Sequence, residues 1–421
     1  MTALQVRAGA LYVPVMTAML AALVRRPGKR LATGCLLSFL WALGTLVVLQ
    51  WVNEWFGFWH FTSGDVWFCG MPLELYLGWA VLWGLVPQLL FRRMALAHVA
   101  VVLGIADVWV MPLFGSVAPL SDIWMIGEAV ALLLVLLPAI AIARWTAEDT
   151  HLRVRVPMQV AISGMLFLMV LPEIAFAMRP GRGWALLLET PRWLLQIELQ
   201  VIGLLAVPGL AAVMEFGERG NGSPIPFDPP KRLVTCGVYR YVANPMQMSC
   251  AVVMLAWAGV LRSGWYALAA AGALVYGAGL AAWDERTDLQ ERFGDEWRAY
   301  RAEVKDWRVR WRPYHEGAPA RLYIARTCGP CSELRRWIEA RRPVGLELVD
   351  AETLAAGSIR RMRYEVEGEQ LEGIRALGRV LEHLNAGWAF CGALVRMPGV
   401  WQAVQLVSDA SGLGPRELHA S

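Results

Sequence analysis

Two polar, aromatic-rich segments carry the residues best suited to chemistry. The first covers residues 237–247, Gly-Val-Tyr-Arg-Tyr-Val-Ala-Asn-Pro-Met-Gln, and the second covers residues 283–300, from Trp-Asp-Glu-Arg to Phe-Gly-Asp-Glu-Trp-Arg-Ala-Tyr. A hydrophobic stretch long enough for two membrane crossings lies between them, so we expect both segments at the same membrane face. They can then close on one small polar molecule beside a lipid-soluble one. The pair therefore predicts a split active site.

A dithiol, Cys328-Gly329-Pro330-Cys331, is the second chemical signal. A strand-like run at 321–325 precedes it, and a helical run at 332–341 follows it. A strand that leads into Cys-x-x-Cys at the start of a helix places the first sulfur at the positive end of the helix dipole, which favours the thiolate. We therefore predict that Cys328 is the nucleophile and Cys331 the resolving thiol.

The elements that must position these residues are mainly membrane helices. Hydrophobic residues make up 57% of the 421 residues and charged residues only 18%, which lies outside the range of soluble domains. Runs of about 20 apolar residues, enough to span the hydrocarbon, recur along the first two thirds of the chain. They predict about nine helices, at 4–24, 31–53, 71–91, 94–114, 123–143, 157–178, 193–216, 245–262 and 264–283.

Loop charges set the expected orientation, because lysine and arginine accumulate on the cytoplasmic side of a membrane. The loops after the first, third, fifth and seventh predicted helices hold most of these residues, whereas 54–70 and 115–122 hold none. We therefore predict an outside amino terminus, a cytoplasmic carboxyl terminus and a multi-pass location in the cell's inner membrane. The first helix is not expected to be a cleaved signal, because its positive cluster follows the apolar stretch.

The composition changes to charged and water-compatible after residue 285. Aromatic and arginine residues at helical spacing predict a helix over 285–313 that lies at the cytoplasmic interface. The segment from Pro313 to Pro319 predicts a linker. The expected domains are a membrane domain of about six helices at 1–192, a membrane domain of three helices at 193–313, a linker at 314–319 and an α/β domain at 320–421.

Residues 193–313 resemble the isoprenylcysteine carboxyl methyltransferase and phospholipid methyltransferase superfamily of membrane enzymes. The positions that match its pattern are Gly237, Tyr239, Arg240, Tyr241 and Pro245, followed by Glu285, Phe293, Gly294 and Tyr300. Four positions depart from it. Asn244 stands where the family has His, Gln247 where it has Tyr, Asp284 replaces the first of two Glu, and Trp297 takes the first aromatic position after Phe-Gly.

The resemblance implies methyl transfer from S-adenosylmethionine to a lipid-soluble acceptor, isoprenoid or phospholipid-like, at the cytoplasmic face. Such an in-line displacement demands positioning and electrostatics more than proton transfer. Asn244 can donate and accept a hydrogen bond as a neutral His can, although it cannot titrate near pH 7. The resemblance assigns Arg240 and Asn244 to the reaction, and to cofactor binding it assigns Tyr239, Tyr241, Asn244, Pro245, Gln247, Asp284 and Glu285.

Other interpretations of the same residues stay open. Arg240 could anchor at the headgroups, Asn244-Pro245 could cap a membrane helix, and Asp284 and Glu285 could simply end the next one. The hairpin and its tail also resemble membrane sterol reductases, which use a nicotinamide cofactor. A non-catalytic membrane scaffold is a third possibility.

Residues 321–421 resemble the thioredoxin-like thiol-disulfide oxidoreductases of the DCC type, through 381–388 (Leu-Glu-His-Leu-Asn-Ala-Gly-Trp) and 397–400 (Met-Pro-Gly-Val). The resemblance implies a thioredoxin-like fold and a protein thiol or disulfide as partner. The cis-proline that faces the disulfide in ordinary thioredoxins has no counterpart at 358–364. A membrane-tethered oxidoreductase, whose helices only anchor it or bind a quinone-like or isoprenoid partner, is the rival to methyl transfer.

Two further interpretations of the dithiol stay open, an idle thiol pair and a zinc site that uses His383 or Cys391. The absence of a second closely spaced ligand pair argues against zinc, and we expect no bound metal. Cys236, just before the first polar segment, is a candidate target for the dithiol. The net charge of +4 follows from the cytoplasmic loops and gives no ground for nucleic-acid binding.

Acidic residues inside the predicted helices form a last group, because ionisable side chains in hydrocarbon normally face a cavity or a partner. On the predicted topology they map to the outer half of the membrane and indicate a polar chamber that opens outward, with hydrogen bonding between helices as the alternative. Residues 70–77 are weakly similar to a stretch of membrane lycopene cyclases, which points to an isoprenoid-binding region. The group consists of Glu74, Asp107, Glu128, Glu173 and Glu198.

Overall fold

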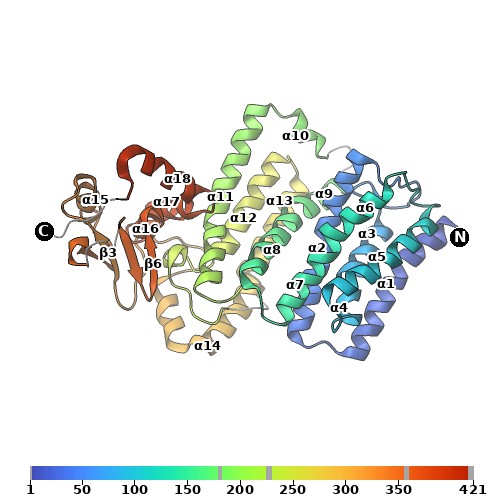
Figure 1. Cartoon of the computed structure of the whole chain (residues 1–421), viewed down its shortest axis with the longest axis horizontal. Coiled ribbons are helices and arrows are strands. Elements are labelled where there is room, and N and C mark those ends of the chain that lie inside the picture. The colour runs from blue at the N-terminus through green and yellow to red at the C-terminus, as the bar shows by residue number, and fades with distance from the viewer. Residues whose placement is uncertain (1, 179–182, 224–229, 355–359, 416–421) are drawn as a thin grey trace. The chain divides into compact units, whose positions relative to one another are not determined.

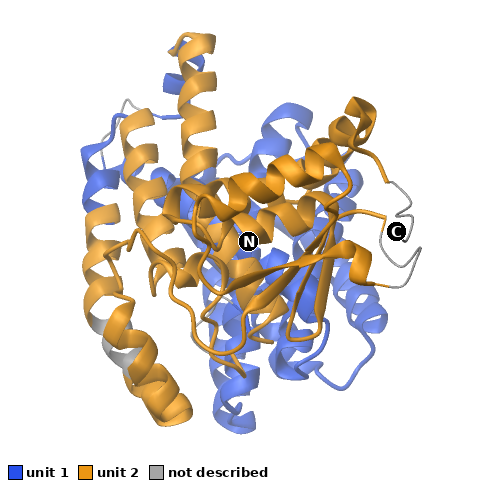
Figure 2. Ribbon diagram, turned by 90° about the vertical axis from the view of Figure 1, so that its left-hand side faces the viewer, with its two compact units in different colours: residues 1–189, 222–229, 261–269 blue, residues 190–221, 230–260, 270–421 orange. Residues whose placement is uncertain are grey.

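The computed structural model describes residues 2–178, 183–223, 230–354 and 360–415, without the side chains of 280–286. The chain forms two compact units. Unit 1 comprises Met1–Glu189, Gly222–Pro229 and Leu261–Ala269, and unit 2 comprises Thr190–Asn221, Pro230–Val260 and Ala270–Ser421 (Figures 1 and 2).

Seven helical segments in the described part of the chain are long and apolar enough to cross a membrane, so the protein is a helical membrane-embedded protein. They correspond one by one to the first seven predicted helices. They cover Ala3–Arg25, Lys29–Phe56, Leu73–Leu90, Leu96–Phe114, Trp124–Ala147, Leu152–Ala177 and Arg192–Glu218. The helix at Pro245–Val260 is shorter, and the next one leads into side chains that are not described. The eighth and ninth crossings therefore stay predictions.

Unit 1 is an all-helical bundle with one small hairpin, β1 (Trp67–Phe68) and β2 (Met71–Pro72). Two of its crossings contain a π-helical segment, Leu132–Leu136 and Leu166–Val170, and each segment ends two residues before a proline, Pro138 and Pro172. A proline cannot donate to the carbonyl one turn back, and a π segment absorbs that interruption without ending the helix. The helices of this unit are α1 (Ala3–Arg25), α2 (Lys29–Phe56), α3 (Leu73–Gly84), α4 (Val86–Leu90), α5 (Leu96–Val110), α6 (Trp124–Ala131), α7 (Leu137–Ala147), α8 (Leu152–Met165), α9 (Leu171–Ala177) and α10 (Ala185–Glu189).

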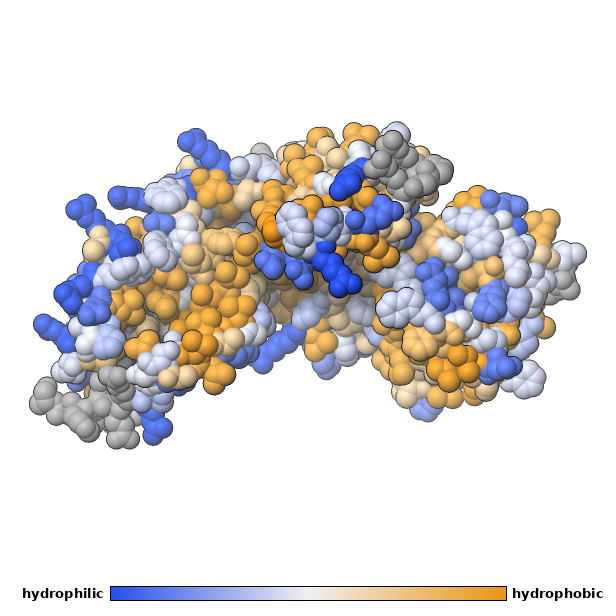
Figure 3. Space-filling model, turned by 90° about the horizontal axis from the view of Figure 1, so that it is seen from above, coloured by the Kyte–Doolittle hydropathy of each residue, from blue (hydrophilic) through white to orange (hydrophobic). Residues whose placement is uncertain are grey.

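Large apolar side chains stand on the outside of these helices as well as in the core. Val24, Trp109 and Leu133 are more than half exposed, whereas Leu75 and Leu136 are fully buried. Figure 3 shows hydrophobic side chains in patches on the surface, among hydrophilic ones. Exposed residues of this kind fit a lipid environment and not water.

Unit 2 begins with α11 (Arg192–Glu218) and α12 (Pro245–Val260), which pack against each other. It continues through α13 (Gly264–Tyr276), whose first residues belong to unit 1, and α14 (Ala282–Glu303). The predicted interfacial helix over 285–313 was wrong in its extent, because α14 bends at Gly294 (φ 50°, ψ −116°) and ends at Glu303. Its aromatic residues Trp297 and Tyr300 are buried in protein and do not face a membrane surface.

From Ala320 onward, unit 2 holds a four-stranded sheet of order β4-β3-β5-β6. We call this region the sheet-containing part of unit 2. Strand β3 (Ala320–Ile324) pairs in parallel with β4 (Leu346–Asp350) and antiparallel with β5 (Arg363–Val366), which turns through Glu367-Gly368 into β6 (Glu369–Glu372). Both turn residues have positive φ, as a two-residue hairpin requires. The helices of this part are α15 (Gly329–Glu339), which connects β3 to β4, followed by α16 (Gly373–Leu381), α17 (Ala386–Arg396) and α18 (Val400–Ser408).

Candidate functional site

The dithiol stands at the junction between β3 and α15. Cys328 is the N-cap of α15, with extended backbone angles (φ −92°, ψ 121°), and its carbonyl accepts the first helical hydrogen bond from Ser332 N at 2.9 Å. Cys331 follows in the first turn. Both side chains are half-buried and pack in an apolar cluster with Tyr323 and Val349. The sequence therefore predicted this local arrangement correctly, with α15 beginning three residues earlier than expected.

Glu352 fixes the loop that precedes Cys328. Its Oε1 accepts hydrogen bonds from Arg326 N at 2.8 Å, Thr327 N at 3.1 Å and Thr327 Oγ1 at 3.0 Å. Burial opposes ionisation of Glu352, yet the hydrogen bonds, first that from Thr327 N, lower its pKa overall. An ionised Glu352 therefore holds the backbone that aims the Cys328 thiol. Nothing in the sequence near the dithiol marked this residue.

The two polar segments of the predicted split site lie together. Tyr300 donates from its hydroxyl to the Tyr239 carbonyl at 2.8 Å, and Trp297 and Tyr300 share an apolar cluster with Ala243. The chain after α14 then follows the first segment through backbone hydrogen bonds, from Ala243 N to Lys305 O at 3.0 Å, from Arg310 N to Tyr241 O at 3.0 Å and from Tyr314 N to Arg240 O at 2.9 Å.

Arg240 and Tyr241, which the resemblance assigns to the reaction and to the cofactor, are buried against the sheet-containing part of unit 2. The Tyr241 hydroxyl donates to the Glu382 carbonyl at 2.9 Å, and Arg240 Nη1 lies 3.4 Å from His383 Nδ1. Tyr239 is also buried, at 5% exposure. The Tyr241 hydroxyl therefore donates its hydrogen bond within the protein.

His383 is a neutral imidazole in this contact. Its Nδ1–H donates to the Val344 carbonyl at 2.8 Å, which leaves Nε2 to accept from the Tyr364 hydroxyl at 2.9 Å. Burial, and next the Arg240 guanidinium, hold the pKa of His383 well below its usual value. These contacts direct His383 into the protein core, and no group of three or more metal-ligating side chains gathers anywhere in the described part of the chain.

Gln247 Oε1 and Trp307 Nε1 are among the buried side-chain atoms that have no hydrogen-bond partner within the described residues. Both flank Gly277, where an added Cβ would lie 3.3 Å from Gln247 Oε1 and 4.0 Å from Trp307 Cζ2. Asn244 is 8% exposed and immediately precedes α12, which begins at Pro245. The side chains of Asp284 and Glu285 lie outside the described residues.

A buried ionic cluster ties α11 to the sheet-containing part of unit 2. Glu215, which is fully buried, accepts from Arg379 Nη1 at 2.5 Å and from Arg396 Nη2 at 2.7 Å. Both arginines also pair with Glu382, which is 3% exposed. In the sequence, Glu215 inside the predicted helix 193–216 is the one indication of this cluster. No local pattern predicts its arginine partners, which lie more than 160 residues away.

Cys236 belongs to the same surroundings, because its thiol donates to Glu215 Oε2 at 3.4 Å. Burial, and next the Glu215 carboxylate, raise the pKa of Cys236 to about 12. Such a thiol is protonated at neutral pH and does not suit attack or exchange. The arrangement therefore gives no support to Cys236 as a target of the dithiol.

Glu74 and Glu173, in the membrane helices of unit 1, have separate partners. Glu74 pairs with Arg7 at 2.6 Å, and Glu173 accepts from Trp184 Nε1 at 2.5 Å. Glu198, on α11, is half-buried.

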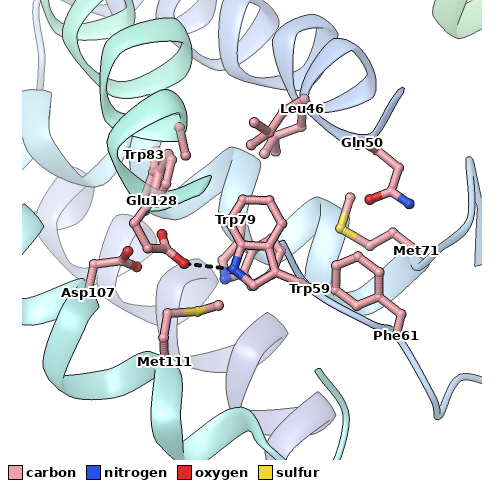
Figure 4. Close-up of a pocket in the computed structure, with 12 residues that line it drawn as sticks. Leu46, Gln50, Trp59, Phe61, Met71, Trp79, Trp83, Asp107, Met111 and Glu128 are labelled. Atoms are coloured by element: carbon pink, nitrogen blue, oxygen red, sulfur yellow. Dashed lines mark hydrogen bonds between the residues drawn. The ribbon is translucent and has the colours of Figure 1, made fainter. Parts of the chain in front are cut away.

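Asp107 and Glu128, the two remaining acidic residues, lie side by side next to Trp59 (Figure 4). The Trp59 indole donates to Glu128 Oε1 at 2.9 Å. The adjoining cavity of about 20 Å³ is lined mainly by aromatic and apolar side chains. A cavity of this size holds about one water molecule, so hydrogen bonding between helices describes these residues better than an open chamber.

Comparison with known proteins yields no match to a family model, to a curated protein or to a solved structure.

Proposed function

We propose that residues 320–421 form a thioredoxin-like domain that exchanges its dithiol with protein disulfides. The observation that carries this proposal is the placement of Cys328 at the N-cap of α15, directly after the central strand β3, with Cys331 one turn along. A helix amino terminus stabilises a thiolate at that position. The sheet order β4-β3-β5-β6, with β3-α15-β4 in parallel connection and β5-β6 antiparallel, also fits such a domain.

In the proposed reaction the Cys328 thiolate attacks one sulfur of a partner disulfide and forms a mixed disulfide. The partner's other sulfur leaves as a thiolate and takes up a proton. Cys331 then loses its proton and attacks the Cys328 sulfur, which releases the second partner thiol. Two electrons thus pass from the domain to the partner, and the domain ends as a Cys328–Cys331 disulfide. With a dithiol partner the same steps run in reverse.

Trapping of the mixed disulfide tests this proposal on the full chain in lipid nanodiscs. A fluorescent peptide that contains one disulfide serves as partner, and every variant carries Cys391→Ser because Cys391 is an exposed thiol. We expect a stable adduct in Cys331→Ser, where no resolving thiol remains, and none in Cys328→Ser. An adduct that persists after Cys328→Ser, or one that never forms in Cys331→Ser, contradicts the proposal.

A second candidate function, methyl transfer from S-adenosylmethionine, is favoured by the pair Gln247 and Trp307. A buried acceptor and a buried donor without a partner among the described residues are costly, and a polar ligand would satisfy both. S-adenosylmethionine carries ammonium and hydroxyl donors, which Gln247 would accept, and a carboxylate, to which the Trp307 indole would donate. When bound, it would supply an electrophilic methyl group. The family resemblance also assigns Arg240 and Tyr241 to this function, and their side chains contact His383 and Glu382.

Equilibrium binding of radiolabelled S-adenosylmethionine to the full chain in nanodiscs tests this second function. We expect the double variant Gln247→Ala, Trp307→Phe to lose binding. Gln159→Ala is the control, because Gln159 is a glutamine of unit 1 whose buried amide atoms also have no partner among the described residues. Binding of NADPH in place of S-adenosylmethionine would favour the reductase alternative, and equal loss in both variants would contradict a local site.

A further inference from the structure

Helix α17 packs against the apolar part of the membrane-spanning helix α11. Ala393 of α17 and Met397, which directly follows α17, share a buried cluster with Val207 and Ala211 of α11. Figure 1 shows α17 beside α11, with α18 next to α17. The sheet-containing part of unit 2 therefore meets a membrane helix on its side and not only at its end.

The depth of this contact follows from the sequence of α11. Residues 201–214 are an uninterrupted apolar run, which Glu215 ends. The 27 residues of α11 make a helix about 40 Å long, which exceeds a hydrocarbon layer of about 30 Å. Val207 and Ala211 lie about 16 and 10 Å from the Glu218 end along the axis. They belong to the hydrocarbon-spanning part of α11, so α17 lies at the boundary of the hydrocarbon layer.

The next helix, α18, turns an apolar face outward. Its inward side is anchored by Gln405, whose Oε1 accepts from Ile374 N at 2.9 Å. Leu406 and Val407 are 72% and 64% exposed, and Leu413 in the following turn is 51% exposed. A helix on a water-soluble domain carries polar residues on its exposed side. We define the α18 face as Ala403, Leu406, Val407, Ala410 and Leu413, all of which are exposed.

The flank of the α18 face has the side chains of a membrane interface. The Arg375 guanidinium stands over the Trp401 ring, 5.6 Å from its centroid, and Arg375 is exposed. Tryptophan and arginine together are typical of the headgroup layer, where the ring sits among headgroups and the guanidinium reaches phosphate.

We propose that the α18 face inserts into one leaflet of the bilayer, so that the sheet-containing part of unit 2 is embedded in the membrane surface. Continuity argues for lipid as the occupant, because α11 exposes Leu204 and Leu210 in the same apolar stretch that α17 contacts. A stable protein interface takes about 20 to 30 residues a side, far more than the α18 face provides.

Photocrosslinking in the full chain in nanodiscs tests this proposal. The photoreactive residue p-benzoylphenylalanine replaces Leu406 in one variant and, as a matched control on an exposed helix surface, Arg336 of α15 in another. Both positions are exposed, so neither replacement disturbs a core. We expect phospholipid adducts, read as a lipid-mass shift of the tryptic peptide, several-fold more abundant at 406 than at 336.

Two other results overturn the proposal. Equal lipid adducts at 406 and 336 place the α18 face in water. A crosslinked dimer at 406 makes this face a contact between two copies of the chain. A third variant with the probe in place of Leu413 must give lipid adducts as well, because both side chains belong to the same face.

Discussion

Replacement of Glu215 by glutamine tests whether the buried ionic cluster holds the sheet-containing part of unit 2 on α11. Glu215 is fully buried, and its partners Arg379 and Arg396 are 1% and 8% exposed. Removal of one partner from a buried ion pair costs about 3 to 5 kcal/mol, because a charge stays buried without compensation. Both arginines keep Glu382 as a partner, so we expect the lower value, about 3 kcal/mol, or roughly a hundredfold in an opening equilibrium.

The opening is measurable by native-state proteolysis of the full chain in nanodiscs, with cleavage in the segment after α14. When opening and closing are faster than cleavage, the cleavage rate follows the open population, so Glu215→Gln should be cut about a hundred times faster than the parent. Asp295→Asn is the control, because it breaks an exposed ion pair with Arg298 that is worth at most about 1 kcal/mol. If Glu215→Gln is cleaved no faster than Asp295→Asn, the cluster has no docking role.

Three further predictions concern other positions in unit 2. The pKa of His383 is lowered in the folded chain, so below about pH 6.5 the unfolded chain binds a proton at this residue that the folded chain does not. The free energy of unfolding should therefore fall by up to about 1.4 kcal/mol for each pH unit below pH 6.5. Melting curves at about pH 7.5 and 5.5 should therefore shift less in His383→Gln than in the parent, and equal shifts contradict the assignment. Glu352→Ala removes the acceptor of three hydrogen bonds before Cys328 and should slow disulfide exchange several-fold in a stopped-flow assay, with unchanged helicity by circular dichroism; an unchanged rate speaks against a positioning role. Gly237 has φ +59°, and a Cβ there would lie 2.8 Å from Glu215 Cγ, so Gly237→Ala should destabilise the protein by about 1 to 3 kcal/mol. Gly272 has open space around its Cβ position, so Gly272→Ala should not destabilise the protein. Equal melting temperatures for the two variants would count against the close approach at Gly237.

Local signals in the sequence predicted local structure well. A strand followed by Cys-x-x-Cys placed Cys328 at a helix start, and the helix began at Gly329, earlier than expected, because Pro330 is well accommodated in a first helical turn. Apolar length likewise located seven membrane-spanning helices, since the thickness of the hydrocarbon fixes the length of each run.

Contacts between distant residues were beyond the same reasoning. Tyr241 and Glu382 are 141 residues apart, and no local pattern indicates that the tyrosine hydroxyl meets that carbonyl. The periodic aromatic residues after α13 predicted an interfacial helix, but Trp297 and Tyr300 pack in a protein core instead. A pattern of amphipathic residues shows that one face is covered, and it does not tell whether lipid or protein covers it.

The redox behaviour of the Cys328–Cys331 pair tests the central proposal most directly. The full chain in nanodiscs is equilibrated in buffers of graded potential, and the two thiols are counted by alkylation and mass spectrometry of the peptide that carries them. The account predicts that both thiols disappear together in one two-electron transition, at a potential between about −270 and −120 mV, the range of thiol-disulfide oxidoreductases. Thiols that stay fully alkylated across that range, or that disappear independently of each other, would contradict it.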